Sequence, residues 1–146
     1  MSDFRVLPRI DEDNEFFWTS GREGVLRFLG CDHCGYLIHP PGPVCPKCWS
    51  RQVSPQPVSG RATLYSFTIN HQNWAPGTEE PYVIGIVVPV EQNDIRLTTN
   101  VIGIDPGAVE IGMELEVVFE DRDPVFLPLF RPVAASATAA PRDGTP

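Results

Sequence analysis

The chain has 146 residues, of which 42 % are hydrophobic, enough for one domain or for two small modules that share a core. Its 11 basic and 19 acidic residues give a formal net charge of −8, and such an acidic surface repels nucleic-acid phosphates. The longest apolar run, residues 82–90, is too short to cross a bilayer, and residues 1–15 are acidic rather than signal-like. We therefore expect a soluble, cytoplasmic protein that binds neither nucleic acid nor a membrane.

Residues 1–30 are expected to form a helical and extended segment. The acidic residues 1–12 lead into a short helix predicted over residues 14–20, with Asp13 or Asn14 as its cap. Three consecutive aromatic residues lie on this helix: Phe16, Phe17 and Trp18. They cannot all face one way on so short a helix, so either the rest of the fold or a partner protein covers them. All three are candidate partner contacts.

The four cysteines of the chain form two Cys-x-x-Cys pairs: Cys31, Cys34, Cys45 and Cys48. Two residues between ligands let each pair hold an ion from one tight turn, and four thiolates complete the tetrahedral shell of Zn²⁺. Gly35 follows the first pair and suits the positive φ of such a turn, whereas Trp49 stands in the matching place of the second. With sulfur in all four positions, the metal is expected to be structural, and residues 31–53 to be a zinc ribbon.

Two other states of the four sulfurs stay open at this point. Iron in a rubredoxin-like site suits the same tetrahedral ligands. Disulfides would require an oxidising compartment, for which the N-terminal residues give no sign. His33 and His39 lie nearby in the sequence, but four sulfurs already complete the shell, so both are expected to face solvent or to lie outside the set of ligands.

A period-two pattern begins after residues 54–57, which resemble a linker. Five short strands are predicted, over residues 61–71, 82–90, 95–104, 114–120 and 125–130. With one long loop at residues 72–81, they fit a five-stranded OB-fold barrel over residues 58–132, so the protein is expected to be mainly β. In the first strand, Thr63, Tyr65, Phe67 and Ile69 are expected to share one face. The Ala- and Pro-containing residues 133–146 are predicted to be a disordered tail.

No catalytic residue is predicted. The thiols are used by the metal, and the chain has no Gly-x-Ser-x-Gly elbow, no His-Glu-x-x-His motif and no glycine-rich phosphate loop. His71 is expected to be a solvated residue at the end of a strand. In the long loop, Trp74 is a further candidate partner contact, and Arg51 and Arg61 are candidate donors to phosphate groups.

The order and spacing of these motifs resemble those of one known family. An aromatic helix precedes Cys31-x-x-Cys34-Gly35, a proline-rich insert follows, and Cys45-Pro46-x-Cys48 completes the ribbon. The barrel begins with GRATLYSFT at residues 60–68 and ends with LPLFRP at residues 127–132. Over roughly residues 14–132 the chain resembles the rubredoxin-like zinc-ribbon plus OB-fold family of acyl-CoA-associated proteins, long known as a domain of unknown function. Trp49 departs from the glycine that the family usually has.

The resemblance implies a non-catalytic accessory subunit in a hetero-oligomer. Family members assemble with thiolase-fold enzymes, among them thiolases and lipid-transfer-protein-like aldolases that shorten steroid side chains, and some are joined to hotdog-fold enoyl-CoA hydratases. It also implies that the four cysteines bind structural zinc. Acyl-CoA would be a ligand of the complex, sheltered or channelled with the help of this subunit, and Arg51 and Arg61 are the candidate CoA contacts.

Two alternatives come from other functional classes. OB-fold barrels and zinc ribbons both occur in proteins that bind single-stranded nucleic acid, although the acidic balance and the single lysine, Lys47, argue against that function here. An electron carrier with iron in the four-sulfur site is the second alternative.

Overall fold

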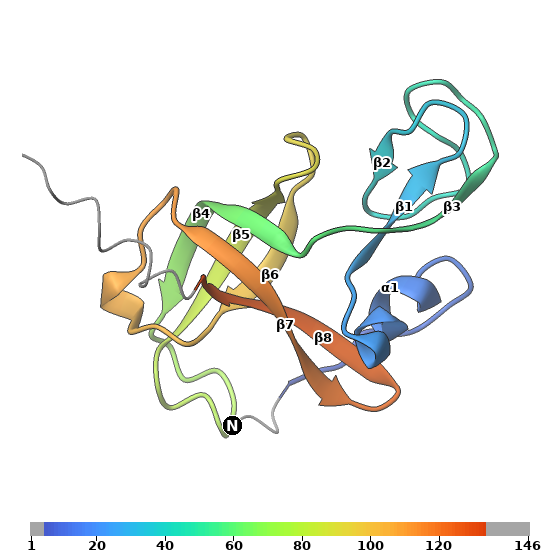
Figure 1. Cartoon of the computed structure of the whole chain (residues 1–146). Coiled ribbons are helices and arrows are strands. Elements are labelled where there is room, and N and C mark those ends of the chain that lie inside the picture. Colours follow the sequence, from blue (N-terminus) through green and yellow to red (C-terminus); the bar gives the residue numbers. More distant parts are fainter. Residues whose placement is uncertain (1–4, 134–146) are drawn as a thin grey trace, which may run out of the picture.

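The computed structural model describes residues 5–133, and the predicted tail lies almost entirely outside the described residues. Figure 1 shows a β-barrel with a smaller sheet beside it and a short helix below that sheet, next to the β7–β8 end of the barrel. Within residues 5–133, the helices are too short to cross a bilayer. The prediction of a mainly β chain with one short N-terminal helix, a ribbon and a five-stranded barrel is confirmed.

The helical segment consists of α1 (Glu15–Thr19) and the 3-10 helix η1 (Ser20–Glu23). The Asp11 carboxylate caps the turn before α1, since its Oδ1 accepts hydrogen bonds from the backbone N–H groups of Asp13 and Asn14 at 2.9 and 3.0 Å. The residues before this turn are tied to the barrel. The Arg5 guanidinium donates to Asn100 Oδ1 at 2.7 Å and forms an ion pair with Glu120 at 3.2 Å.

The smaller sheet has the order β2-β1-β3 and is built from β1 (Arg27–Cys31), β2 (Leu37–Ile38) and β3 (Val53–Pro57). Both pairings of β1, with β2 and with β3, are antiparallel. The expectation that residues 54–57 form a linker is wrong, because they belong to β3 and pair with β1 along its whole length. Prolines within a strand are compatible with an edge position, where their missing N–H groups leave no ladder bond unmade.

The barrel closes in the order β4-β5-β6-β8-β7. Its elements are β4 (Arg61–Asn70), β5 (Tyr82–Pro89), β6 (Leu97–Val101), the 3-10 helix η2 (Pro106–Ala108), β7 (Glu114–Arg122) and β8 (Val125–Pro132). Four contacts between strands are antiparallel, and β6 and β8 are parallel with a single paired position, Val101 with Phe130. This is the barrel that the spacing of the strands predicted.

A β-bulge in β4 overturns the expected strand face. The register with β5 shifts between Leu64 and Ser66, so Tyr65 is the extra residue. Before the bulge, Leu64 is buried and Tyr65 points outward with 53 % of its surface exposed. After the bulge, Phe67 and Ile69 pack against the core. Because one added residue exchanges the two faces of a strand, the predicted common face is wrong.

An aromatic cluster joins the helix, the ribbon sheet and the barrel. Phe17 is only 2 % exposed and Phe28 is fully buried. The His39 ring lies 5.0 Å from the Phe17 ring and 5.2 Å from the Phe28 ring, measured between centroids. Phe16 and Trp18 are partly buried and pack against the same core. The fold itself therefore covers much of the aromatic trio, and Phe17 has no surface to offer to a partner.

The turn between β5 and β6 forms the second link between barrel and ribbon. The Gln92 carboxamide accepts from Leu37 N–H and donates to Leu37 O, both at 2.8 Å. The side chain thus makes the two hydrogen bonds that a neighbouring strand would make with Leu37 of β2. Gln92 also donates to Asp94 at 2.8 Å, and Asp94 in turn accepts from the Tyr36 hydroxyl at 2.8 Å. That last bond raises the pKa of Tyr36 and lowers the pKa of Asp94. Two independent contacts thus fix the ribbon on the barrel.

The buried position of His39 predicts an acid-sensitive fold. Burial lowers its pKa from 6.5 to about 4, so between these values the unfolded chain binds a proton that the native chain does not, and stability falls as the pH falls. We measure the free energy of unfolding with denaturant at pH 7.5 and at pH 5.0. Between these pH values, we expect this free energy to fall by about 2 kcal/mol more in the wild-type protein than in His39→Leu. Protonation of the thiolates lowers it in both proteins and so cancels in the difference. Equal losses in the two proteins would contradict the prediction.

Candidate metal centre

The first Cys-x-x-Cys pair lies in a tight turn at the end of β1. Gly35 N–H donates to Cys31 O at 2.9 Å, and Cys34 N–H points at the Cys31 sulfur at 3.4 Å. Gly35 has a φ of 80°, in the left-handed region where a Cβ atom is unfavourable. The sequence therefore supplies glycine at the one position of this turn that needs it.

The second pair forms the same turn without a glycine. Trp49 N–H donates to Cys45 O at 2.9 Å, and Lys47 N–H points at the Cys45 sulfur at 3.3 Å. Trp49 has a φ of 66° and is the only non-glycine residue with a positive φ in the part of the chain that the structure describes. The two turns match despite the different residue, and the Trp49 side chain is 77 % exposed.

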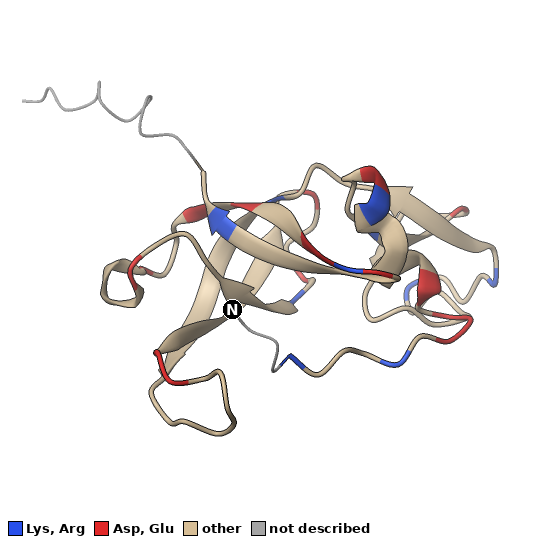
Figure 2. Ribbon diagram, turned by 90° about the horizontal axis from the view of Figure 1, so that it is seen from below, with Lys and Arg blue, Asp and Glu red and all other residues tan. Residues whose placement is uncertain are grey.

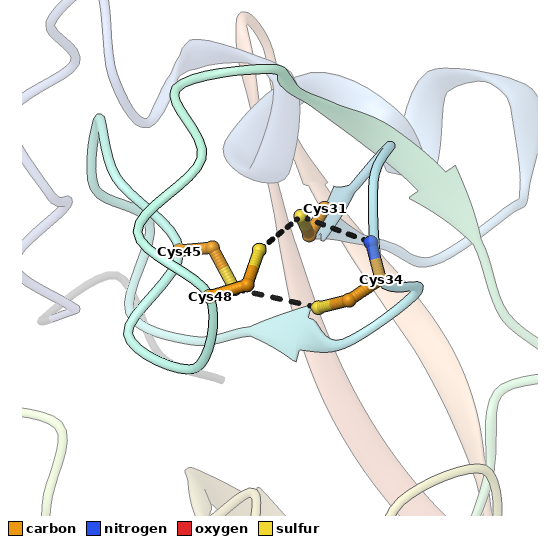
Figure 3. A group of neighbouring side chains, drawn as sticks. All are labelled: Cys31, Cys34, Cys45 and Cys48. Atoms are coloured by element: carbon orange, nitrogen blue, oxygen red, sulfur yellow. Dashed lines mark hydrogen bonds between the residues drawn. The ribbon is translucent and has the colours of Figure 1, made fainter.

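The four sulfurs converge on one point between the two turns (Figure 3). The Cys31 and Cys48 sulfurs lie 3.6 Å apart, the Cys34 and Cys45 sulfurs lie 3.7 Å apart, and all four lie within 4.8 Å of one another. A tetrahedron with metal–sulfur bonds of about 2.3 Å has edges of about 3.8 Å, which these distances fit. A disulfide needs a sulfur–sulfur distance of about 2.05 Å, so disulfides are excluded in this arrangement.

The cluster shifts the pKa values of two of its thiols in opposite directions. The backbone N–H of Cys34 lowers the pKa of Cys31 to about 6. The backbone N–H of Ser50 also lowers the pKa of Cys48, but burial and the three other cysteines outweigh it and raise that pKa to about 12. The Cys31 thiolate thus forms easily and the Cys48 thiolate does not. A divalent ion would remove this opposition, because its charge lies at the centre of the four sulfurs.

Neither nearby histidine belongs to the ligand set. His33 is exposed, and the His39 ring lies in the aromatic cluster with Phe17 and Phe28. Among residues 5–133, the one group of side chains placed to hold a metal is the four cysteines. A closed shell of four sulfurs leaves no coordination position for water or substrate, so the centre can brace the ribbon but cannot activate a ligand.

The predicted partner and CoA contacts are spread over the surface. Trp74 is 70 % exposed, and its indole N–H donates to Asn70 Oδ1 at 2.8 Å, so the ring is held at the end of β4 with most of its surface open. Arg51 is exposed on the ribbon and Arg61 is exposed at the start of β4. The structure does not gather these residues into one site with Phe16 and Trp18.

Two features of functional interest were not predicted as such. In the sequence, Trp49 stands out only as a departure from glycine. The structure shows in addition that its ring is exposed and that its backbone keeps an unfavourable positive φ, a combination that is typical of functional positions. The hydrogen bonds of Gln92 and Asp94 to the ribbon had no signal in the sequence, where both residues looked like ordinary turn formers.

Loss of one sulfur ligand should unfold the ribbon. We expect Cys45→Ser to lose the bound zinc and several kcal/mol of stability, because the metal contributes on the order of 10 kcal/mol to such folds. His33→Ala, a substitution beside Cys34, should keep one zinc per chain, since four sulfurs complete the shell. Metal analysis and thermal unfolding measure both outcomes. A stable Cys45→Ser protein without metal would show that the ribbon does not depend on it.

Relief of the backbone strain at Trp49 should stabilise the ribbon. We expect Trp49→Gly to raise the free energy of unfolding by about 0.5 to 1 kcal/mol, because glycine removes the cost of the left-handed conformation and the exposed ring loses little packing. Trp49→Ala, which keeps the Cβ atom, should not gain this stability. Chemical denaturation compares the two. An equal gain in both variants would mean that the indole, not the backbone angle, is unfavourable.

Comparison with known proteins agrees with both modules. Residues 18–54 match the family model of the ChsH2 rubredoxin-like zinc ribbon domain, and residues 55–120 match that of the ChsH2 C-terminal OB-fold domain. A probable enoyl-CoA hydratase alpha subunit of Thermomonospora curvata is 37 % identical over 129 residues, which are 88 % of this chain and 40 % of that protein. The 3-oxo-4,17-pregnadiene-20-carboxyl-CoA hydratase alpha subunit of Mycobacterium tuberculosis is 32 % identical, over 82 % of this chain and 37 % of that protein. The chain thus spans about two fifths of these relatives.

Shorter relatives match over most of their own length. The benzoylsuccinyl-CoA thiolase subunit BbsA of Thauera aromatica is 33 % identical, over 73 % of this chain and 74 % of that subunit. A chain in the structure of an Ltp2-ChsH2(DUF35) aldolase is 37 % identical with a TM-score of 0.78, over 86 % of this chain and 98 % of that chain. The two family models together match residues 18–120, and the chain belongs to the ChsH2-type DUF35 family of zinc-ribbon and OB-fold proteins.

Proposed function

We propose that this chain is an accessory subunit that binds and stabilises a thiolase-fold enzyme acting on acyl-CoA. The observation that carries the proposal is the match over 98 % of a chain in an Ltp2-ChsH2(DUF35) aldolase, at 37 % identity. The similarity to a thiolase subunit supports the same class of partner. Both relatives are parts of larger enzymes, which fits a subunit whose own metal shell is closed.

The chemistry of the described residues supports a scaffold rather than a catalyst. The four thiols form one closed cluster, and the buried His39 stays neutral at physiological pH because burial lowers its pKa to about 4. The exposed rings of Trp49 and Trp74 are the kind of side chain that forms the centre of protein interfaces. Phe16 and Trp18 are partly buried, so only the exposed parts of their rings can contact a partner. Phe17 is buried, and we do not include it among the proposed partner contacts.

The complex is proposed to shelter or channel the acyl-CoA as it passes between sites. In this chain Arg51 and Arg61 remain the proposed CoA contacts, because both are exposed and neither forms an ion pair within residues 5–133. A steroid-derived thioester is one substrate that the M. tuberculosis relative suggests, and a hotdog-fold hydratase is a further proposed partner. Structural Zn²⁺ is the cofactor assigned to the chain itself.

Nucleic-acid binding receives no support from the charge distribution. Figure 2 shows the lysine and arginine positions scattered along the described part of the ribbon, among acidic segments. A net charge of −8 would oppose a phosphate backbone at every approach.

Co-elution tests the proposed function. We expect the zinc-loaded chain to co-elute with one thiolase-fold enzyme of its own genome in size-exclusion chromatography, at a mass that requires both chains. It should not bind a single-stranded oligonucleotide at physiological salt. Elution of the chain alone with every such enzyme would contradict the proposal, and salt-sensitive oligonucleotide binding would favour the nucleic-acid alternative.

A further inference from the structure

The outer face of β5 is apolar along its length, which is unusual for the solvent side of a barrel. The inward residues of this strand, such as Val83 and Val87, are buried in the core. The alternating outward residues are not polar, as they normally are when water covers the face, but are Tyr82, Ile84, Ile86 and Val88, followed by Val90. Val90 has 63 % of its surface exposed.

Tyr65 and Arg96 border this apolar strip on its two sides. The register places Val88 opposite Thr63 on β4 and places Val87 opposite Leu97 on β6, so Arg96 and Tyr65 flank the outer side of β5 near Val88. The Arg96 guanidinium lies 4.1 Å from the centroid of the Tyr65 ring, reaching across the strip.

The rest of the described chain leaves part of this face open. The helices pack against β1, β7 and β8, and the extended residues Arg5 and Val6 reach the Tyr82 and Ile84 end of the strip. What remains is the outer patch, defined as Tyr65, Ile86, Val88, Val90 and Arg96, in which Ile86 and Val88 are partly buried and the other three are exposed. The exposed Ile111 lies near the Tyr65 end of the outer patch. Its neighbour Gly112 donates its backbone N–H to Leu64 O at 2.8 Å, and Leu64 directly precedes Tyr65.

The charge of the outer patch indicates what covers it. Arg96 bonds to two backbone carbonyls, those of Asn93 and Ile95, but forms no ion pair with a carboxylate within residues 5–133. The acidic Glu114 lies beyond β4, paired with Thr63. A guanidinium that has no carboxylate partner within residues 5–133 and lies beside an apolar strip is complementary to an apolar protein surface that carries a carboxylate.

A second copy of the chain fits the outer patch less well. A twofold contact would bring two like patches together, so each guanidinium would face a surface with the same charge, and two chains of charge −8 would repel one another. A nucleic acid fits neither the apolar strip nor the overall charge. We infer that the outer patch is the docking surface for the thiolase-fold subunit, with a carboxylate of that subunit paired to Arg96. This inference rests on the proposed function.

The test compares two patch variants with two matched controls, by titration of each against a thiolase-fold enzyme of the same genome. Val88→Asp should weaken binding at least about 30-fold, and Arg96→Glu about tenfold with a smaller dependence on salt. Val6→Asp and Arg9→Glu make the same chemical changes at exposed positions outside the patch, and both should bind within about twofold of the wild-type protein. Zinc content and thermal unfolding establish that each variant is folded.

Three outcomes overturn the inference in different ways. If the wild-type protein binds an enzyme and both patch variants bind equally well, the docking surface is elsewhere and the proposed function stands. If the wild-type protein binds no such enzyme, the proposed function fails and the inference fails with it. If sedimentation shows a wild-type dimer that either patch variant converts to a monomer, the outer patch joins two copies of this chain instead.

Discussion

The ribbon depends on four cysteine sulfurs that its turns bring within 4.8 Å of one another, where a bound cation would offset the repulsion between thiolates. The hydrophobic cluster of the ribbon contains only four buried residues, and two of them, Cys31 and Cys45, belong to this group of sulfurs. Such a core is too small to stabilise an independent module. A metal held by the sulfurs would take the place of the missing apolar interior. The tight turn around each cysteine pair, with a backbone N–H bond to the carbonyl of its first cysteine, fits that role.

The ribbon is fixed to the barrel on two sides. On one side, the aromatic cluster of Phe17, Phe28 and His39 connects the helix and ribbon to the main core. On the other side, Gln92 and Asp94 bind Leu37 and Tyr36 directly. The exposed rings of the ribbon and the outer face of the barrel are therefore held in one spatial relation, which a rigid adaptor between enzyme subunits would need.

Much of this architecture could be predicted from local patterns. The spacing of the cysteines predicts, without any tertiary information, the four-sulfur cluster that the structure shows, and alternating residues between glycine- and proline-containing turns predict the barrel strands. The bulge at Tyr65 could not be predicted, because an inserted residue leaves the alternation of side chains looking regular while the backbone register changes. Residues 54–57 looked like a linker for a similar reason, since their prolines are typical both of linkers and of an edge strand.

The surroundings of His39 and the contacts of Gln92 depend on residues distant in the sequence, so no local pattern could indicate them. The same is true of the contacts by which Asp94 fixes the ribbon to the barrel. The role of Gln92 also bears on any attempt to express the ribbon and the barrel as separate fragments. A cut after Pro57 would leave Leu37 with neither its amide acceptor nor its carbonyl donor, and β2, only two residues long, would become an open sheet edge. The covalent boundary and the structural boundary of the two modules do not coincide.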